Sequence, residues 1–232
     1  VRLQASTLNV NPDTLEIKVQ ALDAQAKGQL PEIGAFDVSL TSPSLELSDT
    51  VARGEALNFN ASLEQANRSI KAAVSLTGLE GNLKQSVSAA LQTTLSLVEG
   101  ARTVNLKLSS PLALNIQSKL LALKNINGQL DVQDPALPKQ VASMPLTGSL
   151  ELNNTEKTAE LALNSRFEST RFDLKAAIRG FSKPSIVATL NADKLDIDAL
   201  LPPKKVASAA PAEGTGDKAG DKPVNLSTLR NL

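Results

Sequence analysis

The feature that most constrains this chain is the alternation of apolar and polar residues with a period of two. It runs through Phe36-Asp37-Val38-Ser39-Leu40 and Phe172-Asp173-Leu174, and it recurs at short intervals between residues 15 and 192. Successive side chains of a β-strand point to opposite faces of a sheet, so each segment presents one apolar and one polar face. Parallel sheets covered by helices need nearly continuous apolar strands instead. The pattern therefore predicts an all-β fold based on an antiparallel sheet with one wet face.

Few windows repeat at helical spacing, so little helix is expected. The best helical candidates are short, at residues 115–123 and 138–143, and Pro138 and Pro145 would bound the second. Near the start of the chain, Leu15, Ile17, Val19 and Ala21 follow the strand pattern.

The sequence contains a loose internal repeat with a period of about 70 residues, and self-similarity of this kind is typical of folds assembled from repeated units. The segment around Pro43 resembles the one around Pro111, and Leu76-Thr77-Gly78 resembles Leu146-Thr147-Gly148. We therefore expect residues 1–203 to form one domain of repeated strands.

The composition changes after this domain. Residues 204–223 (KKVASAAPAEGTGDKAGDKP) cannot bury a core and are predicted to be a disordered linker. Residues 224–232 turn apolar again and are interpreted as the start of a further, truncated segment.

The composition also argues against several classes of function. The chain has no Cys, His, Tyr or Trp, and its 24 basic residues balance 24 acidic ones. Without His or Cys, the commonest general base, thiolate nucleophile and metal ligands are missing. A neutral chain poor in aromatic residues is also poorly suited to nucleic acids. We expect no enzymatic activity, no cofactor, no metal and no nucleic-acid partner.

One acidic cluster remains, formed by Asp193, Asp196 and Asp198. Oxygen ligands of this kind suit calcium, but the Gly and distal Glu of a calcium loop are missing. We interpret the cluster as the wet face of a strand.

The same stretch resembles a segment of the AsmA family of Gram-negative envelope proteins, in which a strand of this type precedes a low-complexity insertion and a closing segment. The residues that carry the resemblance are Asp193, Leu195, Asp196, Ile197 and Asp198, and the Ala199-Leu200 pair departs from the family by lacking an aromatic residue. Residues 36–43 and 224–230 also resemble parts of that family.

The resemblance implies a long antiparallel sheet that curls into an open trough lined with aliphatic side chains. It implies a periplasmic location, with an inner-membrane anchor outside these residues, since no signal peptide or apolar membrane span is visible. It further implies transport of phospholipid acyl chains between the two membranes. A closed β-sandwich remains the structural alternative, because its packed faces alternate in the same way.

The predicted groove lining comprises the apolar residues of the clearest alternating segments: Val38, Leu40, Leu57, Phe59, Val74, Leu76, Leu106, Leu108, Leu150, Leu152, Leu161, Leu163, Phe172, Leu174 and Leu190. The functional alternative is a scaffolding module that binds envelope proteins through its sheet edges and assists outer-membrane protein assembly.

Overall fold

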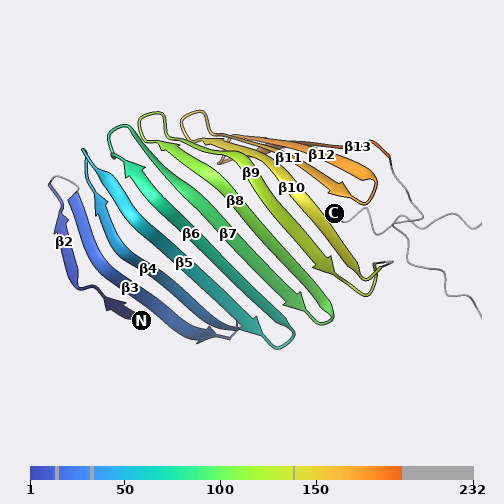
Figure 1. The fold of residues 1–232 in the computed structure, drawn as a ribbon, viewed down its shortest axis with the longest axis horizontal. Helices are drawn as coiled ribbons and strands as arrows, with labels where there is room; N and C mark the ends of the chain where they lie inside the picture. The colour runs from blue at the N-terminus through green and yellow to red at the C-terminus, as the bar shows by residue number, and fades with distance from the viewer. Residues whose placement is uncertain (14–15, 32–33, 138, 195–232) are drawn as a thin grey trace, which may run out of the picture. The chain divides into compact units, whose positions relative to one another are not determined.

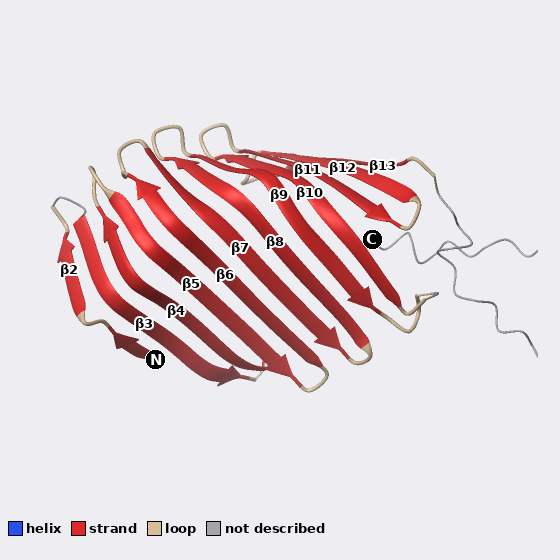
Figure 2. Ribbon diagram, viewed as in Figure 1, coloured by secondary structure: helices blue, strands red, loops and turns tan. Residues whose placement is uncertain are grey.

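The computed structural model describes residues 1–13, 16–31, 34–137 and 139–194, and these residues form strands and turns without any helix (Figure 2). The strands are β1 (Arg2–Gln4), β2 (Thr7–Asn11), β3 (Glu16–Leu30), β4 (Gly34–Leu47), β5 (Ala52–Gln65), β6 (Arg68–Gly81), β7 (Ser86–Glu99), β8 (Arg102–Asn115), β9 (Leu120–Gln133), β10 (Val141–Asn153), β11 (Thr158–Phe167), β12 (Thr170–Arg179) and β13 (Ser185–Ala192). The predicted all-β class is confirmed.

The chain divides into two units, Val1–Pro202 and Pro203–Leu232, and only the first contains described residues. The predicted linker at 204–223 and the predicted segment at 224–232 lie outside the described residues. The domain boundaries therefore stay predictions.

The thirteen strands form one open antiparallel sheet (Figure 1). From β3 to β13 each strand pairs with the next one along the chain, while β1 and β2 both pair with β3. Substantial contacts between the described strands occur only between hydrogen-bonded neighbours, so the sheet neither closes nor packs on a second sheet. The structure thus has the open, curved sheet and excludes the closed β-sandwich for this part of the chain.

The strand register separates an aliphatic face from a polar face. Residues directly opposite each other in an antiparallel pair point to the same side. One such row crosses the sheet as Val38, Ala61, Ala72, Leu95, Leu106, Leu130 and Met144. The adjacent row on the other side is polar, with Asp37, Ser62, Lys71, Ser96, Asn105, Asp131 and Ser143.

Several strands have an unpaired residue near their middle, at which the alternation shifts by one position. Ala21 in β3, Gly78 in β6 and Asn125 in β9 have positive φ angles of 50°, 62° and 59°. A β-bulge of this kind bends a strand and strengthens its local twist. Ala21 was expected to continue the alternation of Ile17 and Val19; this is wrong, because the bulge leaves Ala21 exposed and moves the aliphatic face to Leu22.

Two serine–proline pairs lie on this line of bulges and explain the likeness between the segments around Pro43 and Pro111. Proline has no N–H to donate and is tolerated in inner strands mainly at bulges. The buried Ser42 Oγ lies 2.8 Å from the carbonyl oxygen of Ala56 in the next strand, and the buried Ser110 Oγ lies 2.9 Å from that of Lys124. Each hydroxyl thus donates to a carbonyl where the ladder is interrupted.

The structural repeat is half as long as the sequence suggested. Strands β4, β6 and β8 begin at Gly34, Arg68 and Arg102, which are equally spaced along the chain, and the starts of β5, β7 and β9 have the same spacing. The repeating unit is one β-hairpin. The distance along the chain between the two prolines therefore spans two hairpins.

Both helical predictions are wrong within the described residues. Residues 115–123 form the end of β8, a turn and the start of β9, while Pro145 lies inside β10. The apolar residues of the first window lack a period of two because residues 116–119 are a turn between β8 and β9.

Candidate functional site

All the predicted groove-lining residues lie on the aliphatic face. The register connects them through rows such as Leu40–Phe59–Val74 in one half of the sheet and Leu163–Leu174–Leu190 in the other. Other rows of this same face contain the remaining predicted residues: Leu57, Leu76, Leu106, Leu108, Leu150, Leu152, Leu161 and Phe172. The strand register therefore brings all of these side chains onto one surface.

This face is only partly shielded from water. The hydrophobic residues that are buried among the described ones are mostly small, namely Val19, Ala52, Val87, Ala89, Ala122, Ile126 and Ala142. Phe59 and Leu95 remain 39% and 37% exposed near the middle of the sheet. Among the described residues no Leu or Phe is buried, because no second layer covers the face.

Glycines let large side chains lie flat on the face. A Cβ atom at Gly148 would come within 2.9 Å of Leu163 Cδ2, and one at Gly128 would meet Leu108 Cδ2 even more closely. The two leucines therefore cover the glycine backbone of the neighbouring strand.

One depression lies on this face where β3 to β6 meet. Its volume is about 360 Å³, and it is lined by Leu30, Phe36, Val38, Ala61, Ser62, Leu63, Ile70 and Ala72. The lining offers almost no hydrogen-bonding group, so it can hold a hydrocarbon chain but cannot orient a polar one.

The opposite face is a network of hydroxyl, amide and charged side chains. Asp131 accepts hydrogen bonds from Ser143 Oγ at 2.6 Å and Gln129 Nε2 at 2.9 Å. These bonds, with the nearby charge of Lys107, hold the pKa of the Asp131 carboxyl below its ordinary value. A second groove, of about 530 Å³, lies among such residues on β4 to β9. Its side chains largely satisfy one another.

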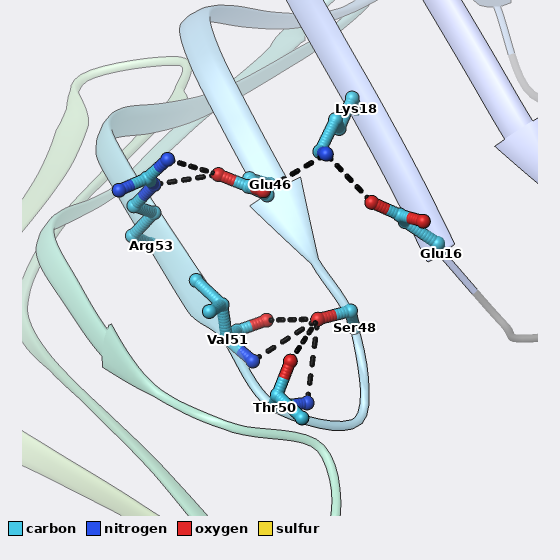
Figure 3. Close-up of polar contacts among 7 residues, drawn as sticks. All are labelled: Glu16, Lys18, Glu46, Ser48, Thr50, Val51 and Arg53. Carbon is cyan, nitrogen blue, oxygen red and sulfur yellow. Dashed lines mark hydrogen bonds and ion pairs between the residues drawn. The ribbon is translucent and has the colours of Figure 1, made fainter.

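A chain of ion pairs crosses β3, β4 and β5 on the polar face (Figure 3). Lys18 Nζ lies 2.6 Å from Glu16 and 3.3 Å from Glu46, and Arg53 Nε lies 2.6 Å from Glu46 Oε2. Partial burial tends to raise the pKa of Glu46, but the hydrogen bonds from Lys18 and Arg53 outweigh it and lower the pKa. These contacts join neighbouring strands across the polar face.

Of the acidic motif, only Asp193 falls among the described residues, and Leu195, Asp196, Ile197 and Asp198 lie outside them. Asp193 Oδ1 accepts a hydrogen bond from the backbone N–H of Arg171 at 2.8 Å, which lowers the pKa of the carboxyl. This contact extends the pairing of β12 beyond β13. The described residues contain no cluster of carboxylates that could hold a metal ion.

Sequence reasoning missed the contribution of β9 to the aliphatic face. Leu121, Leu123, Ile126, Leu130 and Val132 all lie on this face. The signal that could have found them is the pair of alternating runs on either side of Asn125, which tolerates a left-handed conformation better than most residues.

Comparisons of the chain with protein-family models, with curated proteins and with solved structures found no match. The resemblance to the AsmA family therefore stays a prediction. No helix long and apolar enough to cross a membrane is found in the part of the chain that the structure describes.

Proposed function

We propose that this chain is a non-enzymatic lipid-binding module of a Gram-negative envelope protein of the AsmA type. In this proposal the aliphatic face carries the acyl chains of phospholipids between the inner and the outer membrane. The protein would act in the periplasm, anchored to the inner membrane by a segment outside these residues.

The observation that carries the proposal is a single-layer sheet with one continuous aliphatic face. Folding normally buries such a face against another layer. Among the described residues nothing covers it, so Phe59, Leu95 and many half-buried leucines contact solvent. Burial of hydrocarbon contributes about 0.8 kcal/mol per CH₂, so a chain of about 14 carbons gains about 10 kcal/mol before the losses of entropy on binding.

The proposal needs no catalytic group, which fits a chain without His or Cys. It also needs few specific polar contacts, because the lipid headgroup can stay in water. The nearly hydrocarbon-like lining of the depression at Phe36 and Ile70 supports this.

The experiment that tests the proposal compares two lysine substitutions on one strand. Leu163→Lys places a charge on the aliphatic face, whereas Asn164→Lys, the next position along β11, places it on the polar face. After incubation with phospholipid vesicles and removal of the vesicles, lipid bound to each variant is measured by native mass spectrometry. We expect Leu163→Lys to lose most of the bound lipid and Asn164→Lys to keep it.

Both variants are expected to keep a cooperative melt, because the long Lys side chain can reach solvent from an open face. Leu108→Lys and Ser109→Lys repeat the comparison on β8. Equal lipid binding by both members of each pair, or no lipid on the unmutated chain, would refute the proposal.

The scaffolding alternative is favoured by β13, whose residues are all exposed. Ile186, Val187 and Leu190 are 64%, 63% and 65% exposed, and the strand carries no charge. Such an edge can add a strand from another protein. Saturable binding of an unfolded outer-membrane protein that Val187→Pro abolishes, with no lipid bound, would support this alternative.

A further inference from the structure

One end of the sheet carries a row of lysines, one in each of four turns that neighbour one another at that end. Lys84, Lys119, Lys157 and Lys183 lie in the turns β6–β7, β8–β9, β10–β11 and β12–β13, and all four are exposed. The first three of these turns stand side by side along the upper edge of the sheet in Figure 1. Because two strands separate successive turns, neighbouring lysines are spaced by about 10 Å.

Two of these lysines occupy the same position in equivalent turns. Asn115 Oδ1 accepts the N–H of Ser118, and Asn153 Oδ1 accepts the N–H groups of Thr155 and Glu156. Lys119 and Lys157 each follow the asparagine of their turn by the same number of residues. Their φ angles, 53° and 56°, are also alike. The fold therefore presents both side chains from matching backbone positions.

Hydrogen bonds fix the spacing of these turns. The backbone N–H of Asn154 donates to the carbonyl of Lys119 at 3.0 Å, and that of Gly180 donates to the carbonyl of Lys157 at 2.8 Å. Thr155 Oγ1 also donates to the carbonyl of Ser118 at 2.9 Å. These bonds join the turns to one another, so the lysines lie on a continuous rim and not on separate loops.

The charge of this rim is only partly neutralised. Lys84 pairs with Asp49 at 3.1 Å, whereas Lys119, Lys157 and Lys183 form no ion pair with a described residue. Asp49 belongs to the turn β4–β5, and within the four lysine-bearing turns the one carboxylate is that of Glu156. At the opposite end of the sheet, the described turn residue Lys139 is paired with Glu168 at 2.5 Å. Most of the turn lysines at this end are therefore left without an ion-pair partner among the described residues.

The aliphatic face reaches this rim without interruption. Its last row before the turns consists of Leu114, Leu121, Leu152, Ala159, Ile178 and Ile186. A lipid whose hydrocarbon chains contact this row would have its headgroup beside Lys119 and Lys157.

We propose that the rim formed by Lys119, Lys157 and Lys183 binds headgroups of anionic phospholipids, each between two neighbouring lysines, with the acyl chains on the adjoining part of the aliphatic face. This inference rests on the proposed function and deepens it, because it orients the lipid and selects its charge. A zwitterionic headgroup would gain less from two neighbouring unpaired cations than a headgroup of net negative charge.

The test measures the preference of the chain between two lipids with identical acyl chains. The protein is incubated with vesicles of equal parts phosphatidylglycerol and phosphatidylcholine and separated from them by size exclusion. The ratio of the two bound lipids is then measured by mass spectrometry. The unmutated chain should be enriched in phosphatidylglycerol, and Lys119→Gln/Lys157→Gln/Lys183→Gln should lower that enrichment by about tenfold or more.

The matched control is Lys107→Gln/Lys124→Gln/Lys175→Gln, which removes the same charge from exposed lysines of the strands. It should keep the enrichment, and both triple variants should melt like the unmutated chain. Lys119 and Lys157 have positive φ angles, so replacing them can disturb the backbone of their turns. Lys183→Gln alone is therefore also measured, and it should give a partial loss of the phosphatidylglycerol enrichment.

The outcomes separate the two proposals. Equal uptake of both lipids by the unmutated chain, or equal loss in both triple variants, overturns the rim while the lipid-binding function stands. If neither lipid is found on the isolated chain, the lipid-binding function and the rim are overturned together. Sedimentation with phosphatidylglycerol vesicles without any lipid on the isolated chain also overturns the rim as a headgroup site, because the lysines would then contact only the vesicle surface.

Discussion

At the scale of single residues, two serine hydroxyls compensate for interruptions of the sheet. Ser42 and Ser110 are 2% and 6% exposed, and each reaches a carbonyl of the next strand beside a proline. A buried carbonyl without a partner costs free energy, so these hydroxyls stabilise the line of bulges.

Replacing Ser110 by Ala should therefore destabilise the fold, because the carbonyl of Lys124 would lose a buried donor. We expect a loss of about 1–3 kcal/mol in the free energy of unfolding, measured by urea denaturation. Ser88→Ala, an exposed serine of the neighbouring strand, serves as the control and should change stability by less than about 0.5 kcal/mol. A similar effect of both substitutions would contradict this role of Ser110.

The carboxylates of the polar face should make stability depend on pH in the acid range. The pKa of Asp131 is lowered from its ordinary value of 3.8 by the hydrogen bonds of Ser143 and Gln129. Its stabilising contribution is therefore fully present above the ordinary pKa and is lost as the pH falls through the lower folded pKa.

The measurement compares Asp131→Asn with the unmutated chain in thermal melts between pH 7 and pH 2. The difference in Tm should be largest at neutral pH and shrink as the pH falls below 4. Asp23→Asn controls for the loss of a carboxylate that accepts no hydrogen bond from a described residue. A constant difference for Asp131→Asn across this range would show that the hydrogen bonds add nothing to stability.

At the scale of the strands, the sequence predicted the fold class and the aliphatic face but not the details that bend the sheet. Period-two alternation identifies which side of each strand is apolar, and this suffices to place Leu106 and Leu163 on one surface. It fails at bulges, where Ala21 and Asn125 shift the parity, because a bulge depends on the register with the neighbouring strand. The lysine rim was missed for a related reason, since turns far apart in the sequence become neighbours only in the folded sheet.

The edge strand β13 should promote association between copies of the chain. Its exposed Ile186, Val187 and Leu190 lie on a strand without charge, and such edges pair readily with other strands. We expect Val187→Lys to reduce self-association in sedimentation velocity runs while leaving the melt unchanged. Thr94→Lys, on the exposed side of the inner strand β7, should leave the association unchanged. No difference between the two variants would show that β13 is not the associating edge.

At the scale of the whole molecule, the sheet is a row of hairpins in which each strand contacts only its neighbours. Stability in such repeat architectures is approximately a sum over units and their interfaces. The segment 68–101 comprises one hairpin unit, from the start of β6 to the residue before β8. Its removal would bring β5 beside β8 with the antiparallel direction preserved.

We therefore expect the chain lacking residues 68–101 to keep a cooperative melt and the circular-dichroism spectrum of a β-sheet. Removing residues 86–101 instead deletes the single strand β7 and its following turn, so β8 would start at the wrong end of the sheet. This second deletion should lose the cooperative transition. Loss of cooperativity in both deletions would contradict the independence of the hairpin units.

The central claim is that the aliphatic face, and not the polar face, contacts acyl chains. Its most direct test places a photo-reactive amino acid in turn at each position from Glu160 to Ser165 of β11 and measures cross-linking to phospholipid. We predict adducts at 161, 163 and 165, which share the aliphatic face, and few at 160, 162 and 164. Adducts at all six positions, or at none of them, would contradict the claim.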